Sequence, residues 1–336
     1  MNNKVQFSAL NPYEAPNMPN ATERLSRDSQ MIQWGDDNLY PKYLSELYTD
    51  CGILNSVVNG VVDYICGDNI TGIDHEIFRK LALDYTLYNG FALQVVRNVV
   101  GEITNYYYVD FANCRTNEDR SVIYYSKEFD KRRGKMLSYP AFKKDSTETS
   151  SILYVTAPTK NVYPTPMYGA QTTLQACEIQ KNIVSYHFNS LSNGFLGGVM
   201  FNFSNGIPDD ELKEEIEDNI LEKFSGTGNA NRILINFSDD SEHGLQITPL
   251  NVEDFGEKYN TLLSKSEREI FTAFRATPSL FGIPTENVGF NTQEYDSVFQ
   301  LFNRTVVKPI QKTMITALSE VGLEVVVKPF TLNLDD

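Results

Sequence analysis

The chain is poor in the residues that build metal sites and disulfide frameworks. Its 336 residues include three histidines and four cysteines. The histidines are far apart in the sequence, and no two cysteines have the CxxC spacing of a zinc site or a redox motif. These scattered residues are His75, His187, His243, Cys51, Cys66, Cys114 and Cys177. We therefore expect no metal site, no cofactor and no disulfide framework.

Long apolar segments are missing as well. No apolar run approaches the ~20 residues that a membrane-spanning helix needs. The first residues, MNNKVQFSALNPYEAP, have neither the basic n-region nor the apolar h-region of a signal peptide. Together these absences predict a soluble protein of the cytoplasm.

Positive charge is scarce. Lys and Arg number 29 against 44 Asp and Glu, which gives a net charge of −15. A protein that grips nucleic acid by its phosphates needs clustered Lys and Arg, so this composition argues against one. It does not exclude a protein that DNA slides past. Residues 127–144 are locally basic, with seven basic residues against two acidic ones. This pattern favours a solvated loop over a contact for an anionic partner.

What the sequence does contain is enough apolar material for a core. Hydrophobic residues make up 41% of the chain and aromatic residues 12%, which excludes wholesale disorder. The length fits two domains of ~150 residues or one elongated mixed unit. Residues 1–30 are polar and rich in Asn, with three prolines, and we expect them to form a flexible arm.

Apolar spacing in the first half predicts helices followed by strands. A buried helix is expected over Ile53–Cys66, and a second helix begins at a capping Asp74 and ends at Asn89-Gly90. β-branched and aromatic residues predict strands at Phe91–Val100, Ile103–Val109, Val122–Tyr125 and Ile152–Val155. A long helix then covers 170–193. Its apolar residues form more than one stripe, which predicts contacts on several sides, with core elements or with sister subunits.

The second half begins with a compact α/β insert, residues 194–250. We expect a strand at Gly198–Phe203, an amphipathic helix at Asp209–Phe224, and strands at Arg232–Phe237 and Leu245–Leu250. A second long helix follows over about 252–276, and a third runs from Thr292 to Glu320. Pro309 removes a hydrogen bond and clashes with the preceding turn, so a kink or break is expected near Lys308. The last predicted strand is Leu323–Val327.

No part of the chain has the pattern of a catalytic site. The turn at Gly226–Gly228 lacks the rest of a phosphate-binding loop, and the G-x-S-x-G and HExxH patterns are missing. The helix at 209–224 carries eight acidic residues against two basic ones. Paired carboxylates can bind magnesium, but this spacing fits a solvated or partner-contacting face better. We therefore do not expect an enzyme.

The order of the predicted parts resembles that of the portal proteins, the head–tail connectors of tailed bacteriophages. A β-rich region is followed by a long helix, an α/β insert, a returning long helix, a Pro/Gly-rich loop and a kinked last helix. Asn291 and Glu294 open that last helix as in the family. Four further places carry the resemblance: YNGFAL (88–93), YG (168–169) with NGFLGGV (193–199), GNANRIL (228–234), and EREIFTAF (267–274) with TPSLFG (277–282).

The resemblance implies an α+β, portal-like elongated subunit with long stem helices, an α/β clip insert and a mixed α/β wing. The implied parts are the arm (1–30), wing (31–169), stem helix (170–193), clip (194–250), second stem helix (251–276), tunnel loop (277–291), and a C-terminal wing or crown helix with a terminal strand (292–336). It also implies a homo-oligomeric ring, usually of twelve subunits, that forms the DNA channel at the capsid vertex for packaging and ejection. Such a ring has no active site.

The implied partners are the terminase, a head-completion adaptor, the major capsid protein, and double-stranded DNA that passes without sequence-specific binding. The location is the virion, after assembly in the host cytoplasm. The clip contact for terminase or adaptor would use Glu211, Lys213, Glu214, Glu215, Glu217 and Asp218. The DNA-proximal tunnel-loop residues would be Thr285, Glu286, Asn287, Val288, Gly289, Phe290 and Asn291. Two alternatives stay open: a magnesium-dependent hydrolase that uses the acidic helix, and a non-portal phage adaptor or scaffold that binds a basic partner.

Overall fold

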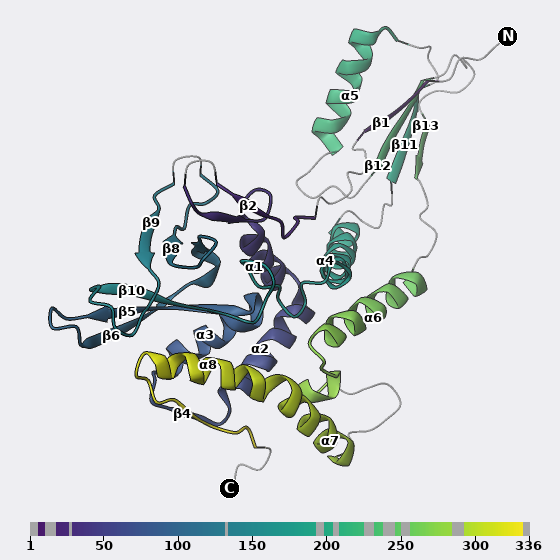
Figure 1. The fold of residues 1–336 in the computed structure, drawn as a ribbon. Helices are drawn as coiled ribbons and strands as arrows, with labels where there is room; N and C mark the ends of the chain where they lie inside the picture. The colour runs from purple at the N-terminus through teal and green to yellow at the C-terminus, as the bar shows by residue number, and fades with distance from the viewer. Residues whose placement is uncertain are drawn as a thin grey trace. The chain divides into compact units, whose positions relative to one another are not determined.

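The computed structural model contains helices and sheets in two compact units (Figure 1). Unit 1 comprises Met1–Asn17 and Ile179–Ser264, and unit 2 comprises Met18–Glu178 and Lys265–Asp336. The predicted mixture of helix and sheet is confirmed. The structure describes residues 6–10, 18–26, 29–131, 134–192, 198–203, 208–224, 232–237, 246–249, 256–283 and 292–331.

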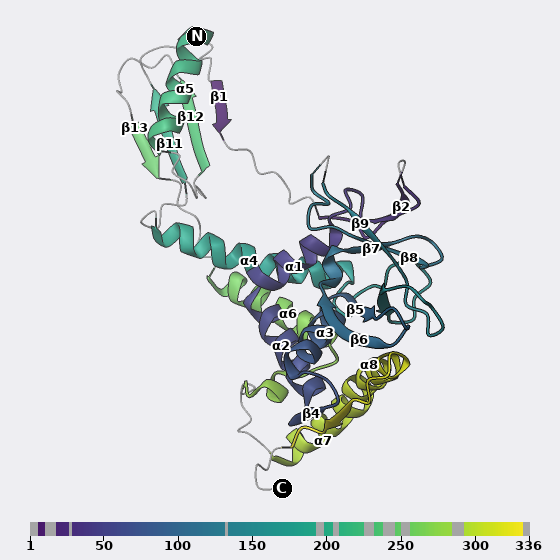
Figure 2. The same ribbon diagram turned by 90° about the vertical axis from the view of Figure 1, so that its left-hand side faces the viewer.

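Unit 1 is built around one four-stranded sheet. Its strand order is β1 (Gln6–Leu10), β12 (Arg232–Phe237), β11 (Gly198–Phe203) and β13 (Gln246–Pro249). β11 and β12 are parallel and are joined through α5 (Asp210–Phe224), so they form a βαβ unit. α5 runs along one face of the sheet in both ribbon views (Figure 2). These elements agree with the predicted insert.

The strand β1 differs from the prediction for residues 1–30, which was a flexible arm. Gln6–Leu10 pairs antiparallel with β12, with Gln6 opposite Phe237 and Leu10 opposite Ile233. A second short strand, β2 (Glu23–Leu25), lies in unit 2. An antiparallel ladder satisfies backbone N–H and C=O groups whatever the side chains are, so a polar segment can form a strand when a partner edge is present.

Unit 2 has a helical core around α2. The helices α1 (Tyr40–Asp50), α3 (His75–Tyr88) and α8 (Lys308–Glu320) pack against α2 (Gly52–Cys66) or against one another. α2 carries six apolar side chains that are at most 1% exposed: Leu54, Val57, Val58, Val61, Val62 and Ile65. Burying each contributes about 1.5–3 kcal/mol relative to exposure. The predicted helix is thus confirmed as a buried one.

The helix α3 begins and ends where the sequence predicts. The Asp74 carboxylate accepts a hydrogen bond from the backbone N–H of Ile77 at 3.0 Å, which satisfies a free donor of the first turn. Asn89 ends the helix in the left-handed region with φ of 56°, and its side chain donates to the carbonyl of Thr165 at 2.7 Å. Short polar side chains of this kind tolerate that conformation.

Three sheets complete unit 2. The strands β10 (Ser150–Thr156), β5 (Gly90–Arg97) and β6 (Ile103–Val109) form an antiparallel sheet that α3 packs against (Figure 1). A five-stranded sheet has the order β2, β3 (Ile32–Trp34), β7 (Cys114–Thr116), β8 (Val122–Tyr125) and β9 (Leu137–Pro140). The strands β4 (Asn69–Thr71) and β14 (Val326–Lys328) pair at the edge of the helical core.

The last helix accommodates Pro309 without a break. α7 (Thr292–Phe302) continues through a π-helical turn, η3 (Asn303–Val307), into α8. The N–H of Lys308 donates to the carbonyl of Asn303, five residues earlier. Pro309 has no N–H and its ring crowds the carbonyl four residues earlier, which lies inside this turn. The predicted irregularity near Lys308 is therefore a widened turn.

Asp84 is a buried carboxyl group of α3. Its two oxygens accept hydrogen bonds from the Tyr108 hydroxyl and from the Phe111 backbone N–H, both at 3.1 Å. Burial raises the pKa of Asp84 well above its ordinary value, and the nearby Asp110 raises it further. The folded protein therefore holds the Asp84 proton more tightly than the unfolded chain does.

This difference makes the stability of the fold depend on pH. Because the folded pKa is the higher one, stability is full below the unfolded pKa and falls as pH rises toward the folded pKa. Each unit of difference is worth about 1.4 kcal/mol. In Asp84→Asn the side-chain amide can accept from the Phe111 N–H and donate to the Tyr108 hydroxyl, and it does not titrate, so this fall in stability with pH should be absent.

The free energy of unfolding by denaturant, measured between pH 4 and 8, tests this prediction, and Asp145→Asn on the surface is the control. If the native protein and Asp84→Asn give parallel curves of unfolding free energy against pH, the account is contradicted.

Candidate functional site

Two long helices, α4 (Gln171–Ser192) and α6 (Gly256–Ala273), correspond to the predicted helices at 170–193 and 252–276. In unit 2, the Thr172 hydroxyl donates to the Glu269 carboxylate at 3.0 Å. In unit 1, the Gln180 side chain donates to the carbonyl of Leu263 at 2.7 Å. Each unit therefore holds part of the α4–α6 pair by its own contacts.

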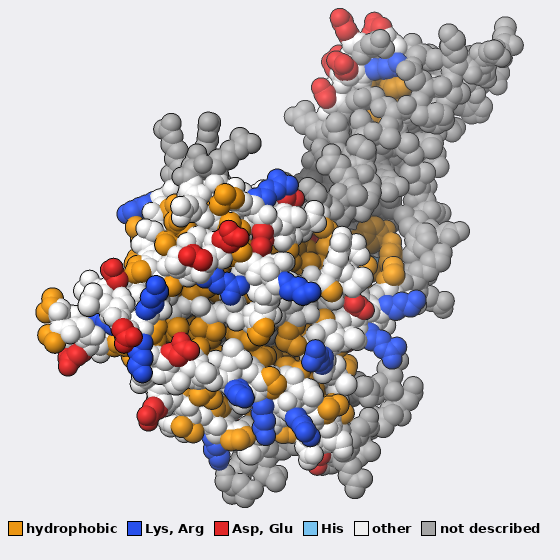
Figure 3. Space-filling view, viewed as in Figure 1, with side chains coloured by type: hydrophobic (Ala, Val, Ile, Leu, Met, Phe, Trp, Pro, Cys, Tyr) orange, Lys and Arg blue, Asp and Glu red, His pale blue; other side chains and the backbone are white. Residues whose placement is uncertain are grey.

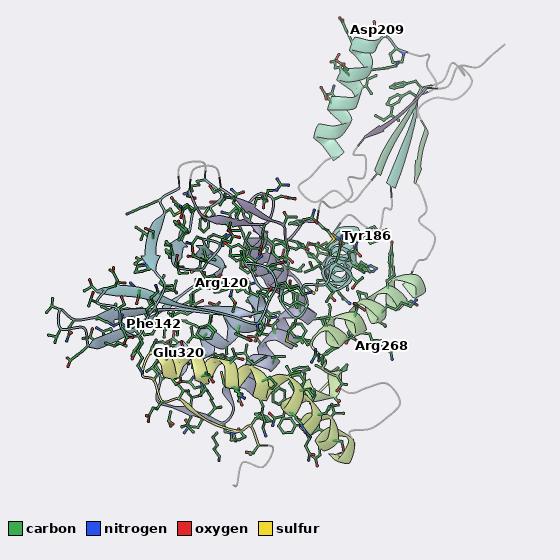
Figure 4. All side chains as sticks on the ribbon, in the orientation of Figure 1. Arg120, Phe142, Tyr186, Asp209, Arg268 and Glu320 are labelled. Atoms are coloured by element: carbon green, nitrogen blue, oxygen red, sulfur yellow. The ribbon has the colours of Figure 1, made fainter. Side chains whose placement is uncertain are left out.

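Aromatic rings extend the pairing within unit 1. The ring of Tyr259 on α6 lies 5.7 Å from that of Tyr186 and 5.3 Å from that of His187, both on α4 (Figure 4 labels Tyr186). His187 meets Tyr259 edge-on, at an interplanar angle of 86°. This edge-on geometry is favourable for aromatic pairs.

The apolar stripe of α4 that runs through Leu174, Cys177, Val184 and Phe188 is buried in the first half of the helix and exposed in the second. Leu174 and Cys177 are at most 4% exposed, whereas Val184 and Phe188 are 62% and 68% exposed. Val184 and Phe188 are four residues apart, so they lie on one face of the helix. The sequence predicts contacts on several sides of this helix, and within one chain the face with Val184 and Phe188 is exposed to solvent.

The helix α5 presents an acidic face. Asp209 caps its start: its carboxylate accepts a hydrogen bond from the N–H of Leu212 at 2.9 Å (Figure 4). Red side chains gather along the described part of this helix in the space-filling view (Figure 3). Of the predicted contact residues, Glu211, Glu214, Glu215 and Asp218 are exposed and Lys213 is half-buried, while the side chain of Glu217 lies outside the described part.

The described residues offer no cage for a metal ion. Within the ranges given above, no three His, Cys, Asp or Glu side chains come together in a way that could hold one. The described part of α5 thus gives the magnesium alternative no support. None of the described helices combines the length and apolar character needed to span a bilayer.

The predicted tunnel-loop residues Thr285–Asn291 lie outside the described residues. The structure does describe the elements before and after them. TPSLFG forms a short 3-10 helix, η2 (Pro278–Phe281), which Gly282 ends with φ of 72°. A Cβ atom added to Gly60 of α2 would lie 2.2 Å from the ring of Phe281, so only glycine allows this approach.

Sequence reasoning assigned no role to Gly60. An isolated glycine inside an apolar helix is the signal that could have found it, because such a glycine costs helix stability and often marks a close packing partner. No comparable signal singles out Phe281 among the 20 phenylalanines of the chain.

The basic segment 127–144 forms two ion pairs, one within the segment and one with a lysine outside it. Its two acidic residues both bind lysines: Asp130 pairs with Lys42 at 3.4 Å, and Glu128 pairs with Lys131 at 2.6 Å. Both pairs are exposed to solvent, where such pairs contribute little to stability. Leu137–Pro140 of this segment form β9, which pairs with β8, so the solvated-loop prediction is wrong there and agrees only with the described residues before this strand.

No model of a known protein family matches the chain. Two curated proteins match part of it. An uncharacterized protein of Rickettsia felis is 31% identical over 141 residues, and one of Rickettsia bellii is 29% identical over 141 residues. Each match covers 40% of this chain and 35% of the relative. The similarity thus spans about a third of the length of these relatives.

Solved structures match nearly the whole chain. A chain from the neck of a native gene transfer agent (GTA) particle, computed with C12 symmetry, has a TM-score of 0.54 at 16% identity, over 88% of this chain and 85% of that one. A chain from the virion of the native GTA particle has a TM-score of 0.51 at 18% identity, over 89% and 86%. An HK97-family phage portal protein from Corynebacterium diphtheriae has a TM-score of 0.46 at 9% identity, over 83% and 90%. These matches confirm the predicted resemblance at the level of the fold, which this chain shares with chains of the GTA particle neck and virion.

Proposed function

We propose that this protein is a portal protein, the ring-shaped channel at the capsid vertex through which DNA is packaged and ejected. The carrying observation is the fold, shared over most of the chain with proteins of the GTA particle neck and virion. The order of motifs along the sequence supports the same conclusion. Fold alone does not fix function, so the surfaces of this chain must fit the role as well.

The ring is proposed on two grounds. The GTA neck structure was computed with twelvefold symmetry, and a subunit of similar fold can close a ring of the same kind. In such a ring every subunit uses two different faces, one toward each neighbour. The exposed apolar face of α4 that carries Val184 and Phe188 supplies one such face.

In a ring of this kind, each segment of the chain takes a distinct structural role. We assign α4 and α6 as stem helices (170–193 and 251–276), residues 194–250 as the clip, and residues 31–169 as the wing. Residues 277–291 become the tunnel loop, and residues 292–336 the C-terminal wing or crown element. The terminase and then a head-completion adaptor dock on the clip, and the major capsid protein surrounds the wing.

The distribution of charge fits a channel that passes DNA without holding it. Unit 1 has 103 of the 336 residues, and it carries 15 of the 44 acidic residues but only 6 of the 29 basic ones. Like charges repel, so an acidic wall keeps phosphates away and prevents tight binding. The exposed carboxylates of α5 also suit a basic patch on a docking protein.

The first test concerns the α4 face. Val184→Asp places a charge on the proposed subunit interface, where burying it without a partner is costly. We expect the ring to dissociate into monomers at concentrations where the native protein stays assembled, by native mass spectrometry. Asn182→Asp adds the same charge on the opposite side of α4, and its ring should persist. Intact rings for Val184→Asp, with normal helix content, would place the interface elsewhere.

The second test concerns the tunnel loop. Deleting residues 285–290 removes the proposed DNA-proximal segment but neither stem helix. We expect rings to assemble normally while particles package or retain several-fold less DNA, because the segment next to DNA is gone. Ring symmetry by electron microscopy is the control, and packaged DNA is measured by nuclease protection. Full packaging by the shortened protein would remove the proposed role from this segment.

The third test concerns α5. Reversing Glu214, Glu215 and Asp218 to Lys should weaken terminase or adaptor binding at least tenfold, because attraction becomes repulsion. The effect should shrink as salt is added. Reversing Glu118, Asp145 and Glu148, three exposed residues of unit 2, changes the net charge equally and serves as the matched control. Equal binding by the two triple variants would rule out α5 as the docking surface.

A further inference from the structure

Tyr64 of α2 connects the two elements that flank residues 284–291. Its side chain is buried, with 6% exposed. Its hydroxyl donates to the carbonyl of Leu280 in η2 at 2.5 Å, and lies 3.0 Å from the hydroxyl of Tyr295 in α7. η2 precedes the segment and α7 follows it. One phenol therefore contacts both sides of the segment, 216 and 231 residues away along the chain.

Counting protons fixes the direction of these hydrogen bonds. A tyrosine hydroxyl has one proton to donate and can also accept. Tyr64 gives its proton to the Leu280 carbonyl, which can only accept. Tyr295 must then donate to Tyr64, so the order is Tyr295 to Tyr64 to Leu280. Burial raises the pKa of Tyr64 above its ordinary value, so the phenol keeps its proton and remains a donor.

Aromatic packing holds the Tyr64 ring in this position. Its centroid lies 6.2 Å from Phe281, 5.6 Å from Phe299, 5.6 Å from Phe302 and 4.9 Å from Phe330. Tyr295 and Phe299 are stacked at an interplanar angle of 5°. The rings come from η2, α7 and the C-terminal segment, and all three meet α2 at one place. Rings at such distances attract one another beyond the effect of burial alone.

We infer that Tyr64 is a positioning residue, which holds η2 and the start of α7 on α2 and thereby fixes both ends of segment 284–291. The relevance of this positioning to DNA rests on the proposed function. The anchoring itself is a property of the described residues. Because η2 is also held by Phe281 on Gly60, loss of the hydroxyl should loosen the flanks without unfolding unit 2.

The test removes the hydroxyl and keeps the ring. Tyr64→Phe loses both hydrogen bonds, whereas Tyr295→Phe loses one and leaves Tyr64 bonded to Leu280. Hydrogen exchange by mass spectrometry on assembled protein follows peptides at 278–283 and at 292–297. We expect Tyr64→Phe to speed exchange about fivefold in both peptides. Tyr295→Phe should speed it at 292–297 alone.

A matched control separates positioning from a general loss of stability. Tyr168 is also buried, and its hydroxyl donates to the carbonyl of Leu87 at 3.1 Å rather than to a group of η2 or α7. Tyr168→Phe should leave both peptides at native rates. The inference is overturned if Tyr64→Phe leaves exchange at 278–283 and 292–297 unchanged, or changes it no more than Tyr168→Phe does.

A second measurement distinguishes failure of this inference from failure of the proposed function. DNA packaging is compared in Tyr64→Phe and in the protein that lacks residues 285–290. If exchange rises as expected while both variants package DNA normally, the anchoring by Tyr64 stands and the channel role of the segment fails. If the deletion impairs packaging but Tyr64→Phe leaves exchange unchanged, the proposed function stands and the positioning role fails.

Discussion

The broad buried face of α2 is the constraint on which unit 2 depends. Its four valines, Leu54 and Ile65 are buried, while Gly52, Ser56 and Asp63 are exposed on the opposite face, so other elements must cover the apolar face of the helix. α1, α3, η3 and α8 do so, and η2 reaches it through Phe281 and Leu280. Segments from both ends of the chain are thereby held on one helix. That arrangement brings the two flanks of residues 284–291 together at Tyr64.

The periodic spacing of apolar residues along the sequence made much of this fold predictable. Buried stripes mark α2, α4 and α6, and the strands and helix of the insert follow their own alternation closely. The short strands β1 and β4 were missed because partners far along the chain determine them. β1 pairs with β12, and β4 with β14, and three- to five-residue segments of this kind have no strong pattern of their own. The sequence predicted where Pro309 disturbs the helix. It did not predict that the disturbance is a π turn, because such a turn depends on packing along the whole helix.

The candidate surfaces were predictable to different degrees. The acidic face of α5 follows directly from residue order and charge. The anchoring by Tyr64 could not be read from the sequence, because one of 19 tyrosines differs from the rest only through contacts made in the folded chain. The exposure of Val184 likewise became visible only in the folded chain, where the start of the same stripe of α4 is buried.

The account requires that an acidic subunit with an exposed apolar face on α4 closes into a ring with its neighbours. The most direct test is the mass and symmetry of the purified protein in solution, by native mass spectrometry and electron microscopy. The account predicts closed rings, with twelve subunits as in the GTA neck. A stable monomer across a wide range of concentration and salt would contradict it.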